Sequence, residues 1–183
     1  MSGGRFRTTV ERLTTGSGYQ ATAERVGLED LGLGHPERVG YTASPWWALR
    51  LLLPRSDVTS SDVFVEFGCG KGRIVLEAAQ RYPFRRVVGV ELAPELTSVA
   101  REIVAREQAR LRCSDVRIET ADAAEYPVPD DMTHAYLYNP FTGATFEHVR
   151  ANILASLERA PRPLRIIYLN PVEHEALTDG GRF

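Results

Sequence analysis

Cysteine, histidine and long apolar runs are scarce in this sequence of 183 residues. Cys69 and Cys113 are the only cysteines, and neither has a second cysteine or a histidine at metal-ligand spacing, so we expect no disulfide framework and no metal site. No apolar run approaches the roughly 20 residues that span a membrane, and the first residues contain no apolar signal core. We therefore expect a cytoplasmic protein that does not enter a membrane.

Lysine is nearly absent as well. Lys71 is the only one, so the basic charge comes almost entirely from arginine. The formal net charge of −2 provides no field that would gather a polyanion, and we therefore do not expect a nucleic acid as partner. The position of Lys71 inside a glycine-rich loop draws attention to that loop.

Two parts of the chain differ in their patterns. Residues 1–40 are polar and dotted with glycine, and we expect an arm or lid there, with one helix near residues 20–26. Residues 41–183 are expected to form the main domain. Its first helix is predicted to begin with Ser44 as the cap and Pro45 at the first helical position.

Strand-like and helix-like segments then alternate along the main domain. Short apolar runs predict strands over 63–67, 87–90, 116–120, 134–138 and 164–169. Apolar residues at helical spacing predict helices over 74–80, 94–112, 145–159 and 172–177. The alternation predicts an α/β fold, a Rossmann-like three-layer αβα sandwich with a mainly parallel sheet, which binds ligands outside the carboxyl ends of its strands.

A glycine loop joins the first of these strands to the helix that follows it. Gly68, Gly70 and Gly72 are spaced G-x-G-x-G, unlike the G-x-G-x-x-G of dinucleotide sites, and Glu66 stands two residues before the first glycine. A carboxylate there would repel a pyrophosphate, whereas it would pair with a ligand ammonium. Glu91 ends the second strand, nineteen residues after Gly72, where a carboxylate can accept both hydroxyls of a ribose.

The segments VEFGCGKGR and VVGVEL together resemble the first two motifs of class I S-adenosylmethionine (SAM)-dependent methyltransferases, and the resemblance extends over about residues 41–171. It implies that SAM is the cofactor. The residues implied to contact it are Gly68, Gly70 and Gly72 at the methionine portion, Glu66 beside them, Glu91 and its neighbour Leu92 at the ribose, Asp122 and its neighbour Ala123 at the adenine, and Asn139.

Simpler readings of these residues stay open. Glu66 could cap backbone groups at the edge of the sheet, and Glu91 could begin a turn. Lys71 and Arg73 could neutralise a ligand carboxylate or remain solvated.

The fourth strand is followed by a segment that points to the methyl acceptor. Tyr138-Asn139-Pro140-Phe141 is similar to, though shorter than, the Asn-Pro-Pro-aromatic motif of amino methyltransferases that act on adenine, guanine or glutamine nitrogen. The resemblance implies that Asn139 and the next carbonyl accept hydrogen bonds from an amino group, with Tyr138 and Phe141 beside the acceptor. The missing second proline weakens the prediction of a planar acceptor. Asn-Pro is also a common turn, and it recurs at Asn170-Pro171.

Two further features come from the same family. Tyr41-Thr42-Ala43-Ser44-Pro45 looks like a segment that closes over the cofactor in several class I branches, so Tyr41 is predicted to contact the cofactor or to staple the start of the helix. The family usually ends in an antiparallel hairpin that this chain has no room for, so we expect the hairpin to be absent or incomplete. The sheet edge left exposed would favour a homodimer.

These observations favour a SAM-dependent methyltransferase that methylates a nitrogen of a small molecule or a protein side chain. The alternative is a SAM-binding sensor or partner subunit without catalysis. A nicotinamide-dependent reductase is disfavoured by the glycine spacing and by Glu66.

Overall fold

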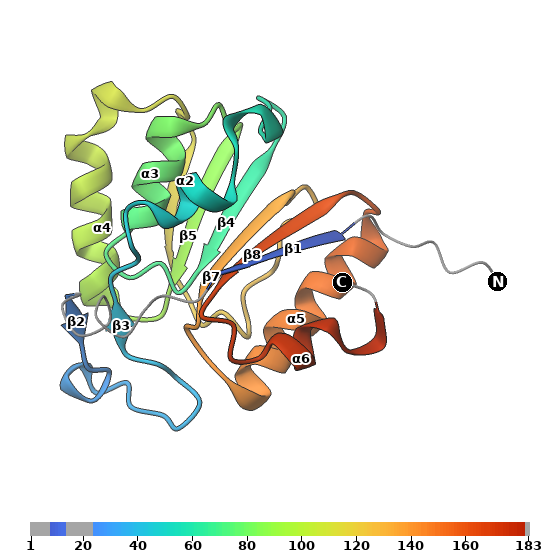
Figure 1. The fold of residues 1–183 in the computed structure, drawn as a ribbon. Coiled ribbons are helices and arrows are strands. Elements are labelled where there is room, and N and C mark those ends of the chain that lie inside the picture. Colours follow the sequence, from blue (N-terminus) through green and yellow to red (C-terminus); the bar gives the residue numbers. More distant parts are fainter. Residues whose placement is uncertain (1–7, 14–23, 182–183) are drawn as a thin grey trace.

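The computed structural model describes the backbone of Thr8–Leu13 and residues 24–181. Its centre is a six-stranded sheet in the order β1-β8-β7-β4-β5-β6, in which all neighbouring strands are parallel (Figure 1). The strands are β1 (Thr8–Leu13), β4 (Val63–Phe67), β5 (Arg86–Glu91), β6 (Val116–Thr120), β7 (His134–Tyr138) and β8 (Leu164–Leu169). A separate antiparallel pair consists of β2 (Arg25–Val26) and β3 (Tyr41–Thr42).

Helices cover both faces of the sheet (Figure 1). One face carries α2 (Ala48–Leu52), α3 (Arg73–Arg81) and α4 (Pro94–Arg106), and the other carries α5 (Gly143–Arg159) and α6 (His174–Thr178). Each face has its own apolar cluster, and β4 contributes Phe64 to the first and Val65 to the second. Because both faces of β4 are covered, all five of its residues are buried. The predicted three-layer αβα sandwich is confirmed.

The predicted main-domain elements differ from the observed ones mainly at helix ends. The helix expected over residues 94–112 ends at Arg106, and a 3-10 turn follows at Gln108–Arg110. The prediction that Ser44 caps the first helix is wrong, because α2 begins at Ala48 after a turn in which the Ala48 N–H donates to the Pro45 carbonyl. The helix expected near residues 20–26 lies partly outside the described residues, and its last part, Arg25–Val26, is strand β2.

The N-terminal segment contributes a strand that sequence patterns did not indicate. β1 pairs in parallel with β8 along its full length, from Thr8 opposite Leu164 to Leu13 opposite Leu169. No antiparallel strand flanks β8 in the described part of the chain. The edge of β8, expected to be exposed, is therefore covered, and the dimer predicted on that edge would need another surface. The division of the chain at residue 40 stays a prediction.

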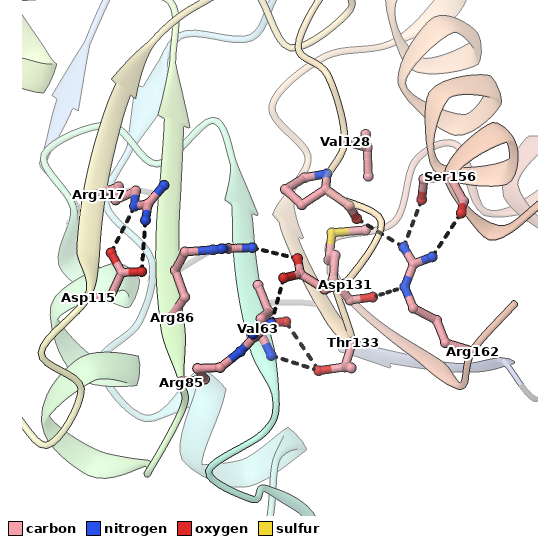
Figure 2. A network of polar contacts seen from close by, with 12 residues as sticks. Val63, Arg85, Arg86, Asp115, Arg117, Val128, Asp131, Thr133, Ser156 and Arg162 are labelled. Carbon is pink, nitrogen blue, oxygen red and sulfur yellow. Dashed lines mark hydrogen bonds and ion pairs between the residues drawn. The ribbon is translucent and has the colours of Figure 1, made fainter. Parts of the chain in front are cut away.

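At the amino ends of the strands, polar contacts tie the end of α5 and the start of β5 to the loop before β7 (Figure 2). The half-buried guanidinium of Arg162 makes five hydrogen bonds, to the carbonyls of Pro129, Met132, Ser156 and Ala160 and to the Ser156 hydroxyl. It thereby satisfies carbonyls at the end of α5 and joins them to the loop before β7. Arg85 and Arg86 both pair with Asp131 in that loop, each at 2.5 Å.

Replacing Arg162 with methionine is expected to lower the free energy of unfolding by about 3 kcal/mol, because charge-assisted hydrogen bonds are lost and buried carbonyls are left unpaired. Arg117→Met is the matched control, since the Arg117 side chain is exposed and pairs with Asp115 at the surface. This variant should change stability by less than about 0.5 kcal/mol. Urea unfolding measures both. Equal stability of the two variants would contradict a structural role for Arg162.

None of the helices in the described residues is long and apolar enough to cross a membrane. Within the same residues, no group of three or more histidine, cysteine, aspartate or glutamate side chains is arranged to hold a metal ion.

Candidate functional site

A cleft of about 840 Å³, which includes the open space at its mouth, lies at the carboxyl ends of the parallel strands. Strand register brings these ends together, because Glu91 pairs with Thr120 and Tyr138 with Leu169. All predicted site residues except Gly70 and Gly72 line the cleft, namely Tyr41, Glu66, Gly68, Glu91, Leu92, Asp122, Ala123, Tyr138, Asn139 and Phe141.

Each of the three glycines in the loop after β4 makes room for a different neighbouring residue. All three have left-handed backbones, with φ of 77° at Gly68, 52° at Gly70 and 74° at Gly72. A Cβ on Gly68 would lie 2.4 Å from Pro140, and one on Gly70 would lie 2.2 Å from the ring of Tyr41. A Cβ on Gly72 would lie 3.0 Å from Ala100 of α4. Gly70 and Gly72 thus position the loop without lining the cleft.

Two buried carboxylates stand beside this loop on adjacent strands. Glu66 Oε2 accepts a hydrogen bond from the Val75 N–H at 3.1 Å. Glu91 Oε2 accepts one from the Gly70 N–H at 2.8 Å, and its Oε1 accepts one from the Ala93 N–H at 3.0 Å. Both simpler readings are therefore seen in part, because Glu66 holds the start of α3 and Glu91 holds the turn after β5.

The electrostatics of the pair favour a positively charged ligand. Burial raises the pKa of Glu66 well above its ordinary value, and the Glu91 carboxylate adds to the rise, while the Val75 N–H opposes it. Neither carboxylate forms an ion pair with any described residue. Since a buried carboxylate is costly without a counter-charge, an ammonium group in the cleft would stabilise both.

The segment from Glu24 to Thr42, which we call the lid, packs against the glycine loop. The only lysine, Lys71, forms an ion pair with Glu24 at 2.5 Å and lies 5.9 Å from the ring centre of Tyr41. Lys71 therefore binds the lid and is neither solvated alone nor directed at a ligand. Arg73 lines the cleft instead, and its guanidinium donates to the Ser44 carbonyl at 3.2 Å.

The lid also pairs with the loop after β7. The Val39 N–H donates to the Pro140 carbonyl at 3.0 Å, and the Thr142 N–H donates to the Glu37 carbonyl at 2.8 Å. The Glu37 carboxylate caps α5, because it accepts from the N–H groups of Ala144 and Thr145 and from the Thr145 hydroxyl. These bonds lower the pKa of Glu37, with the Thr145 hydroxyl as the largest cause.

A third lid contact reaches Asp122. Arg38 Nη2 lies 3.0 Å from Asp122 Oδ2, while Asp122 Oδ1 accepts from the Ala124 N–H at 2.9 Å. Each carboxylate oxygen has a further lone pair, so Asp122 retains capacity for an adenine amino group. The lid thus touches the loops after β4, β6 and β7.

Asn139 is the residue at the site with the least satisfied side chain. Its backbone is left-handed, with φ of 43°, and its Oδ1 atom is buried without a hydrogen-bond partner among the described residues. An unpaired buried acceptor costs on the order of 1–3 kcal/mol, which makes it a candidate ligand contact. Phe141, in contrast, is 5% exposed and packs against Phe146 with ring centres 6.4 Å apart.

Sequence reasoning missed two lid residues that line the cleft, Arg38 and Val39, and it missed Glu37, which joins the lid to the start of α5. Glu37 and Thr145 are 108 positions apart and Arg38 and Asp122 are 84 apart, so no local pattern links them. The signal available was indirect, since positive and negative side chains in a glycine-rich arm suggest partners elsewhere.

Comparisons with known proteins agree on one family. A family described as "Methyltransferase domain" matches residues 64–164. The chain is 32% identical over 63 residues to a protein-lysine N-methyltransferase of Saccharolobus islandicus, a match that covers 34% of this chain and 39% of that protein. The chain therefore spans about two fifths of that relative.

Solved structures also resemble this fold. One is an RNA methyltransferase from Salinibacter ruber in complex with S-adenosyl-L-homocysteine, with 31% identity, coverage of 50% of this chain and 54% of that chain, and a TM-score of 0.41. Another is phosphoethanolamine N-methyltransferase 1 from Haemonchus contortus, with 17% identity, coverage of 68% and 24%, and a TM-score of 0.49.

Proposed function

This chain belongs to the methyltransferase-domain family, whose methyl donor is SAM, and we propose that it methylates a nitrogen of a small molecule or of a protein side chain. The observation that carries the proposal is the pair of buried carboxylates, Glu66 and Glu91, which lack a cationic partner in the described chain. SAM brings an ammonium and a ribose diol, the groups that such a pair would bind.

We propose that SAM lies along the whole cleft. Glu66 would face its ammonium, and Arg73, which lines the cleft, would face its carboxylate. Glu91 and Leu92 would hold the ribose, while Asp122 and Ala123 would hold the adenine. The cofactor, when bound, supplies a methyl group on a positively charged sulfur.

The residues of the chain would act mainly by positioning. Asn139 would hold the acceptor nitrogen, and the lid would exclude water from the cleft. Cys69 is not suited to be a nucleophile, because burial and the carboxylates of Glu66 and Glu91 raise the pKa of its thiol well above the ordinary value. Displacement at a sulfonium methyl needs no covalent intermediate, so positioning supplies most of the rate.

A small molecule or a protein side chain is preferred to a nucleic acid as the methyl acceptor on grounds of charge. The cleft is lined by the acids Glu66, Glu91 and Asp122 and by Arg38 and Arg73, and the chain as a whole carries a formal net charge of −2. This balance provides no excess of positive charge that would bind a polyanion. We place the protein in the cytoplasm for the reasons given by its sequence.

Incubation with methyl-labelled SAM tests this proposal against the non-catalytic alternative. The acceptors are a pool of small amines and a peptide digest, and mass spectrometry locates the label. We expect N-methylated products, lost with Glu91→Ala. Label found only on oxygen or carbon contradicts nitrogen transfer, and SAM binding without any transfer supports the sensor or partner subunit.

A further inference from the structure

The segment Asn139-Pro140-Phe141 resembles, with one proline fewer, a motif in which two oxygen acceptors and an aromatic face would hold a planar amino group. A planar amine delocalises its nitrogen lone pair into the adjacent ring or carbonyl. Holding both of its N–H groups directs that lone pair toward the methyl group. The structure shows which of these three gripping groups remain available in this chain.

The Pro140 carbonyl points toward the lid. It accepts the Val39 N–H at 3.0 Å, and Arg38 pairs with Phe141 as an antiparallel bridge. The contact is fixed on one side by the Glu37 carboxylate at the start of α5. It is fixed on the other side by Gly68, whose missing Cβ makes room for Pro140.

The aromatic face of Phe141 is engaged as well. Phe141 belongs to the apolar cluster between the sheet and α5, where Phe146 and Val149 are also buried. A ring in this position fixes the loop and does not offer its face to a flat acceptor. The Pro140 carbonyl and the Phe141 ring, two of the three groups of this motif, therefore make contacts within the protein.

Asn139 Oδ1 is the group that remains, because it is buried and has no partner among the described residues. We propose that the acceptor is an alkyl amine, which donates one N–H to Asn139 Oδ1, and not a planar amide or nucleobase amine. This inference rests on the proposed function. A single hydrogen bond suffices for an alkyl amine, because its lone pair is localised on a tetrahedral nitrogen.

An alkyl amine reaches the cleft as an ammonium. It loses one proton to water before transfer. The nitrogen lone pair then forms the N–C bond while the S–C bond breaks and its electron pair stays on sulfur, giving a neutral thioether and a methylammonium that releases its proton.

Paired acceptors test the proposal on the full chain with SAM. The alkyl amines are n-butylamine and a lysine-containing peptide, which also separate a free amine from a protein side chain. The planar amines are adenosine and a glutamine-containing peptide. We expect an alkyl amine to be methylated roughly 100-fold faster than either planar one.

Two variants locate the effect at Asn139. Asn139→Ala should lower kcat/KM for the alkyl amine roughly 100-fold, whereas Asn139→Asp, which keeps an oxygen acceptor, should lose less than about tenfold. The SAM dissociation constant, measured by calorimetry, should change less than about threefold in both, which excludes misfolding. Equal loss in the two variants would overturn the role of the Oδ1 acceptor.

These experiments distinguish failure of the alkyl-amine inference from failure of the proposed function. Faster methylation of a planar amine overturns the inference and leaves nitrogen methylation standing. Tight SAM binding with no transfer to either class overturns both the inference and the proposed catalysis.

Discussion

Glu91→Gln is expected to weaken SAM binding by about 100-fold. The substitution keeps the size of the side chain and replaces one carboxylate oxygen with an NH₂ group. That group faces either the Gly70 N–H or the Ala93 N–H, both of which donate to Glu91 in the structure. The variant therefore loses one of these two hydrogen bonds and the carboxylate that would bind the ribose diol.

Glu102→Gln is the matched control. Glu102 is exposed on α4 and lies outside the cleft, so this substitution makes the same chemical change away from the site. Isothermal titration should give it the same SAM affinity as the unmodified chain. A Glu91→Gln variant that stays folded and binds SAM with unchanged affinity would remove Glu91 from the cofactor site.

Gly70→Ala is expected to lower kcat/KM for methyl transfer by roughly 100-fold, because displacement of a cleft wall by about 1 Å has effects of that size. The new Cβ would lie 2.2 Å from the Tyr41 ring, so the lid must move away from the glycine loop. The left-handed backbone of Gly70 adds a strain of about 1–2 kcal/mol.

Two further variants separate the clash from the strain. Gly181→Ala introduces a similar backbone strain, with φ of 60°, at a position where nothing lies within 4 Å of the new Cβ, and its activity should not change. The double variant Gly70→Ala/Tyr41→Ala should be no less active than Gly70→Ala alone, because the clash is removed. Losses that simply add would show that the two residues act independently.

The parts of the fold predicted from sequence are those in which local patterns and packing agree. β4, β6, β7 and β8 have the predicted bounds because short apolar runs enter a sheet covered on both faces. The glycine loop was recognisable because strand, turn and helix follow one another within a few residues, and all three glycines have the positive φ that such a turn requires.

The parts that sequence did not predict depend on contacts distant in the chain. β1 is a strand because β8 offers a free edge about 150 positions later. The lid takes its place through Glu37 and Arg38, which find their partners on α5 and after β6. Helix propensity around residues 20–26 was overridden at Arg25–Val26 by pairing with β3.

The two Asn-Pro pairs share a backbone conformation that the sequence predicts, and they differ in surroundings that it does not predict. Asn139 and Asn170 each end a strand with a left-handed backbone, at φ of 43° and 48°, so the reading as a turn holds for both. Only Asn139 lines the cleft, and its Oδ1 lacks a partner among the described residues. The sequence alone does not separate the two, because the difference arises from the cavity above β4 and β7.

Isothermal titration of the purified chain with SAM, followed by NAD⁺, tests the central claim most directly. The account predicts binding of one SAM per chain, competition by S-adenosylhomocysteine, and no heat from NAD⁺. A folded chain that binds no SAM, or that binds NAD⁺ in its place, would contradict the assignment of this cleft as a SAM site.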